Sequence, residues 1–196
     1  MANNLRSNIV IKGNDKVSDM MKTRIDRCEN LTKEKNEIFG FASAFYNNVE
    51  TSDDGVSVMN SWSNDNLGSK WTYLSDVMDD LEFTIESAWY PPKEFFTHLY
   101  KLCYELDNDC EIEVTYEDES YNPIGAFVFK KDLDGTPCVW QEEDNDIEDP
   151  TVDMDFDDED YEQTQMEFME SLYARSQELL RECHELIHTD GEPVFE

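Results

Sequence analysis

The chain has 196 residues and a formal net charge of −32, with 47 acidic residues against 15 Lys and Arg. A surface of this charge repels nucleic acid and anionic membranes, so any macromolecular partner bound by charge is expected to be basic. Apolar residues make up 39% of the sequence, and the 11 Phe, 9 Tyr and 4 Trp are enough for a folded core, which excludes a wholly disordered chain.

The stretch SNIVIK predicts a first strand over residues 7–12, which stops at a Gly-Asn pair. Helical spacing of apolar residues then predicts a helix from residue 16 to about residue 30. The aromatic-rich residues 38–49 fit a helix or an irregular segment. Residues 56–59 are predicted as a second strand after a run of turn residues, and residues 64–69 as a loop.

In the middle of the chain, residues 71–78 are predicted as a short helix. Residues 81–89 alternate and predict a strand that places Trp89 on its apolar face. Pro92 opens a helix, because proline is tolerated in a first helical turn, where its missing N–H has no partner to lose. Strict alternation over residues 111–116 predicts another strand.

Residues 124–129 and 136–141 predict a hairpin around Asp134-Gly135, a strong hairpin turn signal. From residue 142 to residue 160 there are 12 acidic residues and no basic one; the sequence leaves open whether this run is ordered. Apolar residues at helical spacing then predict a long helix over residues 160–188, followed by a Gly that is typical of a helix C-terminus.

This order of elements predicts an α+β fold: a ferredoxin-like split βαβ antiparallel sheet with one helical face, an added hairpin and a long C-terminal helix. We expect three parts. Residues 1–141 form the ferredoxin-like domain, residues 142–160 an acidic and potentially flexible segment, and residues 161–196 an amphipathic helix packed on the domain.

The five cysteines are scattered and contain no CxxC pair, which argues against a zinc ribbon or a dithiol redox motif. This usage is typical of free thiols in a reducing cytosol. The polar N-terminal stretch does not predict a signal peptide, and the longest uncharged apolar run is too short to span a bilayer. We therefore expect a cytoplasmic protein with no membrane contact; its oligomeric state is not indicated.

Four short stretches carry a resemblance to a known family: Gly68-Ser69-Lys70-Trp71, Glu86-Ser87-Ala88-Trp89-Tyr90-Pro91-Pro92, Tyr116-Glu117-Asp118-Glu119 and Gly125. Over residues 5–131 the chain resembles the YubB ferredoxin-like family of phage- and plasmid-borne proteins, with Ser87 where the family tends to have Thr. The resemblance implies a ferredoxin-like protein of a mobile element, acting in a bacterial host cell. It leaves the acidic tail unmatched and supplies no mechanism.

Within these stretches, Lys70, Trp71, Trp89 and Tyr90 are candidates for a local binding pocket, since Trp and Tyr combine a large contact area with a polar group. The alternative is that both Trp side chains fill the core between sheet and helix. The position of Trp89 at a strand end, beside the helix that Pro92 opens, favours this alternative.

Two metal motifs are present in outline. His184 and His188 belong to an H-E-x-x-H sequence, and only Glu192 or Glu196 follow as third ligands. Asp153-Met154-Asp155-Phe156-Asp157-Asp158 begins like a calcium loop but lacks the Gly at its sixth position and has Thr164 at its twelfth, where a bidentate Glu belongs. We expect neither a metal nor another cofactor. No nucleophile–base pair is evident, so we do not expect an enzyme.

The acidic residues remain as the main candidate site for a partner. Residues 101–196 hold 31 Asp and Glu against 5 Lys and Arg, although much of this part is predicted to fold. The candidate partner-binding residues are Glu111, Glu113, Glu117, Asp118, Glu119, Glu142, Glu143, Asp144, Asp153, Asp155, Asp157, Asp158, Glu159, Asp160, Glu167, Glu170 and Glu178. The alternative is a solvated acidic tail that only keeps the protein soluble.

These observations lead to one leading functional hypothesis and two rivals. The leading one is an acidic phage or mobile-element protein that inhibits a basic nucleic-acid-binding host protein, in defence (restriction or CRISPR) or transcription, by nucleic-acid mimicry. The first rival is a chaperone-like or structural module that masks a basic partner protein. The second is a metal-dependent hydrolase built on His184 and His188.

Overall fold

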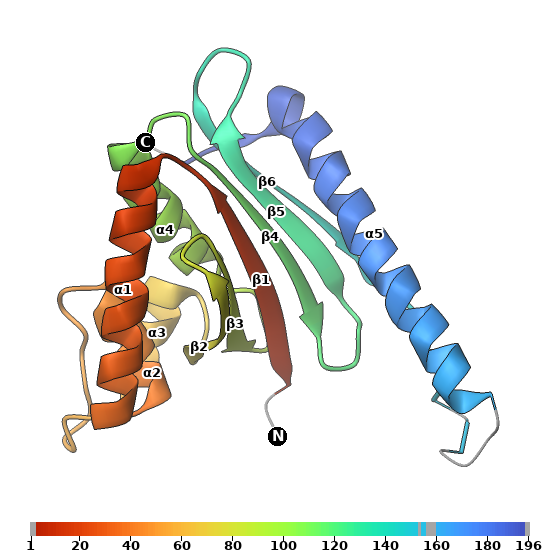
Figure 1. Cartoon of the computed structure of the whole chain (residues 1–196), viewed down its shortest axis with the longest axis horizontal. Coiled ribbons are helices and arrows are strands. Elements are labelled where there is room, and N and C mark those ends of the chain that lie inside the picture. The colour runs from red at the N-terminus through yellow and green to blue at the C-terminus, as the bar shows by residue number, and fades with distance from the viewer. Residues whose placement is uncertain (1–2, 153, 156–159, 195–196) are drawn as a thin grey trace.

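A computed structural model describes residues 3–152, 154–155 and 160–194, which fold into five helices and one seven-stranded antiparallel sheet (Figure 1). The strands are β1 (Asn4–Lys12), β2 (Thr72–Asp79), β3 (Glu82–Ala88), β4 (Glu111–Asp118), β5 (Ile124–Lys131), β6 (Pro137–Asp144) and β7 (Glu192–Pro193). The helices are α1 (Asp15–Glu34), α2 (Glu37–Phe45), α3 (Asn60–Leu67), α4 (Lys93–Leu106) and α5 (Tyr161–Asp190).

The strands lie in the order β2-β3-β1-β4-β5-β6-β7. The first strand is therefore central: Ile9 on β1 lies opposite Phe83 on β3 and opposite Val114 on β4. The hairpin of β5 and β6 extends the sheet on the β4 side. Gly135 adopts a φ of 83° in its turn, which confirms the turn expected at Asp134-Gly135.

One face of the sheet is covered by α1, α2 and α4 (Figure 1). The period-2 pattern of β1 turns Leu5, Ile9 and Ile11 into this core. An aromatic cluster joins two of the helices, with the rings of Phe41 and Phe95 4.8 Å apart between centroids. These contacts pack α1, α2 and α4 as one layer of helices on the sheet.

The long helix α5 packs on the opposite face, over β5 and β6 (Figure 1). A second core forms there, in which Ala126 and Val128 of β5 meet Leu179 and Cys183 of α5. The long C-terminal helix expected from the sequence is thus confirmed. Among the described helices, none has the length and apolar character needed to cross a membrane.

Two local predictions are wrong. Residues 71–78 form most of strand β2 instead of a helix. The pairing of β2 with β3 shifts register twice, between positions 74 and 76 and between positions 77 and 79. These irregularities break the period-2 alternation of apolar residues, so their spacing imitates that of a helix. Residues 56–59 do not form a strand: a single bridge from Val58 to Thr51 closes a loop there. Helix α3 starts at Asn60 and runs to Leu67, so it covers most of the loop expected over residues 64–69.

Two further expectations need correction at the ends of elements. The predicted acidic segment over residues 142–160 starts inside β6, which continues to Asp144. Trp89 does not share the buried face of β3; its side chain is 45% exposed. Strand β3 ends at Ala88, and a φ of 63° at Trp89 turns the next side chain outward.

Candidate acidic interaction surface

Helix α5 presents its side chains on distinct faces. At about 100° per residue, Phe168, Leu179 and Cys183 fall on the side that is buried against the sheet. An acidic row lies about 150° around the helix, within an arc of about 80°; its members are Glu167, Glu170, Glu178 and Glu185. The row is fixed in orientation because the opposite face of the same helix is packed in the core.

Compensating charge is confined to the second half of the acidic row. Residues 161–174 contain no Lys or Arg. Farther along, Glu178 lies 2.8 Å from Arg175 and 3.7 Å from Arg181, and Glu185 lies 3.1 Å from Arg181. Such exposed ion pairs contribute only about 0–1 kcal/mol and are screened by salt. The first half of α5 therefore offers uncompensated carboxylates to the solvent.

Most of the other predicted partner-binding residues that the structure describes are either exposed or bonded to groups within the protein. Glu119, Asp155 and Asp160 are exposed, and Glu119 accepts a hydrogen bond from the Asn4 backbone N–H at 3.3 Å. Four of the predicted residues, Asp153, Asp157, Asp158 and Glu159, lie outside the described residues.

Glu111 and Glu113 belong to a network inside the protein. Lys12 of β1 donates to Glu111 at 2.6 Å and also to Glu113, and His184 of α5 lies 2.6 Å from Glu113. Lys130 donates to the other ring nitrogen of His184 at 2.8 Å. The hydrogen bond from His184, with those from Lys12, lowers the pKa of Glu113 to about 2. Both carboxylates are thus engaged inside the protein, where they share the Lys12 ammonium, and the network ties α5 to the sheet.

This network bears on the metal hypothesis. Glu111, Glu113 and His184 place ligand atoms within 4.8 Å of one another. An ammonium only donates hydrogen bonds, so Lys130 requires an unprotonated Nδ1 on His184. With this bond the ring proton sits on Nε2, the atom that faces Glu113, so a metal at this cluster would have to displace that proton. Lys12 already supplies the cation between the two carboxylates.

His188 does not join this cluster, although it follows His184 by one helical turn. Its Nδ1 is buried and has no hydrogen-bond partner among the described residues. Glu192 lies 3.4 Å from Lys93 instead, and Glu196 is outside the described residues. Within the described part of the chain, the H-E-x-x-H sequence therefore does not assemble as a zinc site.

The acidic residues of β6 are also engaged. Glu142 accepts from the Trp140 indole at 2.7 Å, and Glu143 accepts from the Tyr116 hydroxyl at 2.6 Å. Asp144 pairs with Arg175 of α5 at 2.8 Å. The Glu142 bond lies within β6, whereas Glu143 connects β6 to β4 and Asp144 connects β6 to α5, so the last two carboxylates stabilise the fold.

Asp118 and Glu117 are neighbours with different environments. Asp118 is buried and accepts from the Ser120 backbone N–H at 2.9 Å, which closes the turn after β4. Glu117 is half-buried on the sheet face that α5 borders, and desolvation raises its pKa, partly opposed by Arg6. Glu117 is therefore a candidate for contact with a ligand, whereas Asp118 is structural.

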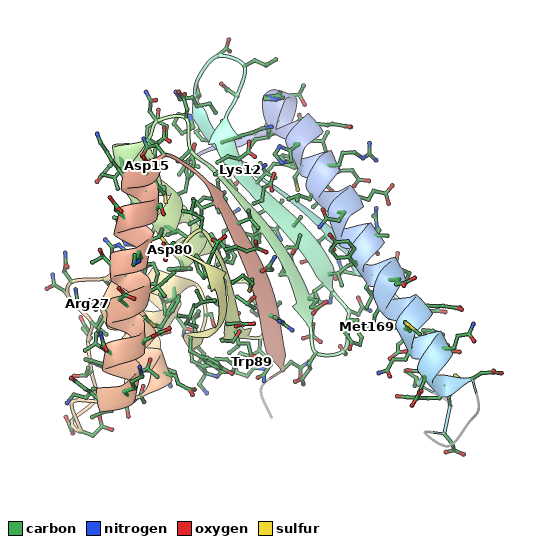
Figure 2. All side chains as sticks on the ribbon, in the orientation of Figure 1. Lys12, Asp15, Arg27, Asp80, Trp89 and Met169 are labelled. Carbon is green, nitrogen blue, oxygen red and sulfur yellow. The ribbon has the colours of Figure 1, made fainter. Side chains whose placement is uncertain are left out.

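The four aromatic-patch candidates are brought to one edge of the sheet. The Lys70 Nζ lies 5.6 Å from the centroid of the Trp89 ring, a cation–π distance, and Tyr90 is 70% exposed. Trp71 is half-buried and stacks on Tyr73. Figure 2 shows Trp89 and Lys12 at opposite ends of the sheet, so this patch is separate from the His184 network.

The resemblance stretches also meet in space. The Ala88 backbone N–H donates to Ser69 Oγ at 3.1 Å, and Ser69 donates to the Trp71 carbonyl at 2.7 Å. Tyr116 lies directly opposite Gly125, where a Cβ would come within 2.3 Å of the Tyr116 ring. Most of these residues thus have structural roles, and Lys70, Trp89 and Tyr90 remain as the exposed ones.

Comparison of the chain with protein-family models, curated proteins and solved structures found no match.

One feature of the surface was missed at the sequence level. Met166, Met169 and Tyr173 have the apolar helical spacing that predicts the last helix, but all three are exposed. At about 100° per residue they lie about 90° from the buried face, beside the sheet. The signal was present, because α5 has more apolar residues than one buried face needs.

Proposed function

We propose that this protein binds a basic nucleic-acid-binding protein of a bacterial host, in defence or transcription, and inhibits it by nucleic-acid mimicry. The observation that carries the proposal is the acidic row of α5, Glu167, Glu170, Glu178 and Glu185, on the face opposite the buried one. A disordered tail would supply the same charge without a fixed position for any carboxylate. Fixed carboxylates lose less entropy when they pair with Lys and Arg.

The row is long, but its charge density is lower than that of nucleic acid. From Glu167 to Glu185 the helix rises about 27 Å, at 1.5 Å per residue. Duplex DNA carries one negative charge per about 1.7 Å of its axis, so the row is sparser than a phosphate backbone. The exposed Asp155 and Asp160, which precede α5, add charge at its N-terminal end.

We also propose membership of the YubB ferredoxin-like family for residues 5–131. The partial order β2-β3-β1-β4, with helices between the strands and on one face, is the arrangement expected for a ferredoxin-like fold. The hydrogen-bonded contact of residues 69–71 with Ala88 supports the same assignment, because the separate stretches form one structural unit.

A second candidate function is a chaperone-like or structural module that masks a basic partner. The exposed Trp89 and Tyr90, next to Lys70, favour it. Exposed Trp and Tyr are frequent hot spots of protein–protein interfaces, and they do not resemble nucleic acid. Mimicry requires that the partner's nucleic-acid groove be blocked, whereas masking does not.

The test begins with affinity purification of the tagged protein from bacterial cells and mass spectrometry of the bound proteins. Duplex DNA or RNA is then titrated into the recovered complex. Mimicry predicts displacement of the protein by nucleic acid; a complex that forms equally well with the partner's groove already occupied contradicts it and supports masking.

A matched pair of variants locates the site. In the α5 variant, Glu167, Glu170, Glu178 and Glu185 are changed to Gln. In the α1 variant, four exposed acids of another helix, Asp19, Asp26, Glu29 and Glu34, are changed to Asn or Gln. Both lose four charges, and mimicry by α5 predicts that only the α5 variant loses the partner.

A further inference from the structure

A groove of about 320 Å³ lies between α5 and the part of the sheet that α5 leaves open. Its helix side includes Met169 and Tyr173, which are 40% and 68% exposed, and Met78 of β2 lines it from the sheet. Met166 continues the same helical stripe and is 60% exposed. Large apolar side chains left in contact with water on one stripe mark a surface suited to a partner.

The floor of the groove comes from the open sheet face. Arg6 and Asn8 of β1, Thr84 of β3, and Thr115 and Glu117 of β4 line it. Figure 1 shows α5 along β5 and β6, while β1, β3 and β2 have no described helix on that side. The sheet face over β1, β3 and β2 thus lies beside α5 without a described helix packed on it (Figure 1).

The floor of the groove contains a carboxylate, Glu117, that lacks an ion-pair partner among the described residues. Glu117 is half-buried, and no hydrogen bond or ion pair joins it to another described residue. Arg6 is its cross-strand neighbour in register, but the two side chains do not form an ion pair. Glu82 and Glu86 alternate with the buried Phe83 and therefore also face the open side. A half-buried carboxylate without a partner is stabilised when a cation pairs with it, because the ion pair offsets the cost of its partial desolvation.

We infer that this groove binds a cationic amphipathic helix of the partner, whose apolar face packs on Met78, Met169 and Tyr173 and whose Lys or Arg pairs with Glu117. The inference rests on the proposed function, since it assigns a second contact to the same basic partner. Methionines adapt their shape to a docked helix. A second copy of this chain does not fit, because each copy carries a net charge of −32.

The test uses two synthetic peptides of about 18 residues, made of Leu, Lys and Ala. In one, Leu recurs at i, i+3, i+4 and i+7, so that the helix is amphipathic; the other has the same composition in scrambled order. Binding to the full-length protein is measured by calorimetry at physiological salt. We expect the amphipathic peptide to bind at least about 10-fold more tightly than the scrambled one, a difference of about 1.4 kcal/mol.

Variants locate the peptide. Met169→Ala with Tyr173→Ala, and separately Glu117→Gln, should each weaken the amphipathic peptide about 10-fold. Leu133→Ala, in the β5–β6 turn and 80% exposed, is the apolar control and should leave binding unchanged. Because the groove side chains are exposed, melting curves should show that all variants fold.

Equal binding of the two peptides, or full binding to the Met169/Tyr173 variant, would overturn the inference. The proposed function has separate readouts. Loss of the partner with the α5 acidic variant and displacement by nucleic acid can both hold while the groove fails. Conversely, peptide binding in the groove without displacement by nucleic acid would support the groove and contradict mimicry.

Discussion

The Nε2 atom of His184 on α5 forms a hydrogen bond of 2.6 Å with a carboxylate oxygen of Glu113 on β4, although the two residues lie 71 positions apart in the sequence. The contact is the centre of a chain of hydrogen bonds, in which Lys130 bonds to the other ring nitrogen of His184 and Lys12 donates to Glu113 from β1. Charge that the sequence assigned to a partner is thus used to attach the last helix to the sheet.

This attachment predicts an acid-sensitive contribution to stability. The pKa of Glu113 is lowered from 4.5 to about 2, first by the hydrogen bond from His184. A depressed pKa contributes stability above the unfolded value, and that stability is lost as the pH falls from about 4.5 to about 2. Glu113→Gln should therefore lower the free energy of unfolding at pH 7 by about 1–2 kcal/mol, allowing for partial solvent screening.

The measurement is urea unfolding of Glu113→Gln and of the wild type between pH 7 and pH 2.5. The variant should show a flatter pH dependence below about pH 4.5. Glu105→Gln, at an exposed position of α4, serves as control. Equal pH slopes for wild type and Glu113→Gln would show that the carboxylate gains nothing from His184 and Lys12.

Trp89 is predicted to be a binding residue with little role in stability. Deleting a buried Trp side chain costs about 3–5 kcal/mol, but Trp89 is 45% exposed and adopts a φ of 63°. This backbone region is unfavourable for a residue with a Cβ and suits glycine. We expect Trp89→Gly to change the free energy of unfolding by less than about 1 kcal/mol. A loss of 3 kcal/mol or more in chemical denaturation would place the ring in the core after all.

Position 125 is predicted to require glycine, because a larger side chain would collide with its neighbours. A Cβ at this position would lie 2.3 Å from the Tyr116 ring and hydroxyl and 2.8 Å from the Glu142 carbonyl. Gly125→Ala should cost about 1–3 kcal/mol of stability through overpacking. In the double variant Gly125→Ala/Tyr116→Leu the ring contact is absent, so the two effects should be less than additive in a double-mutant cycle. Additive effects would mean that the backbone contact, and not Tyr116, sets the requirement.

Part of the fold, but not the contacts of these residues, could be predicted from the sequence. Period-2 alternation located β3 and β4, and helical spacing located α1, α4 and α5. The short run ending at Gly13 located β1, and the Asp134-Gly135 turn located the β5–β6 hairpin, whose strand β5 is buried on both faces. Strand β2 was missed since its irregular pairing removes the alternation. The roles of Glu111, Glu113 and Asp144 were not predictable, because their partners Lys12, His184 and Arg175 come from distant parts of the chain.

The salt dependence of partner binding separates an ordered acidic surface from general solubility. Screening limits the reach of exposed charges to about 8 Å at physiological ionic strength. If the row on α5 contacts Lys and Arg directly, the association constant should fall steeply between about 50 and 200 mM salt, as it does for phosphate contacts. Neutralising Glu167, Glu170, Glu178 and Glu185 should weaken binding at low salt and make this dependence shallower.

The α1 variant, which loses the same number of exposed carboxylates, should keep both the affinity and the slope of the wild type. Local contacts depend on where the charges lie, whereas long-range attraction by net charge depends mainly on their number. Equal losses of slope in the α5 and α1 variants would therefore contradict mimicry by α5, because the partner would then respond to total charge alone. If only the α5 variant changes, the carboxylates held opposite the buried face of that helix are the ones that meet the partner.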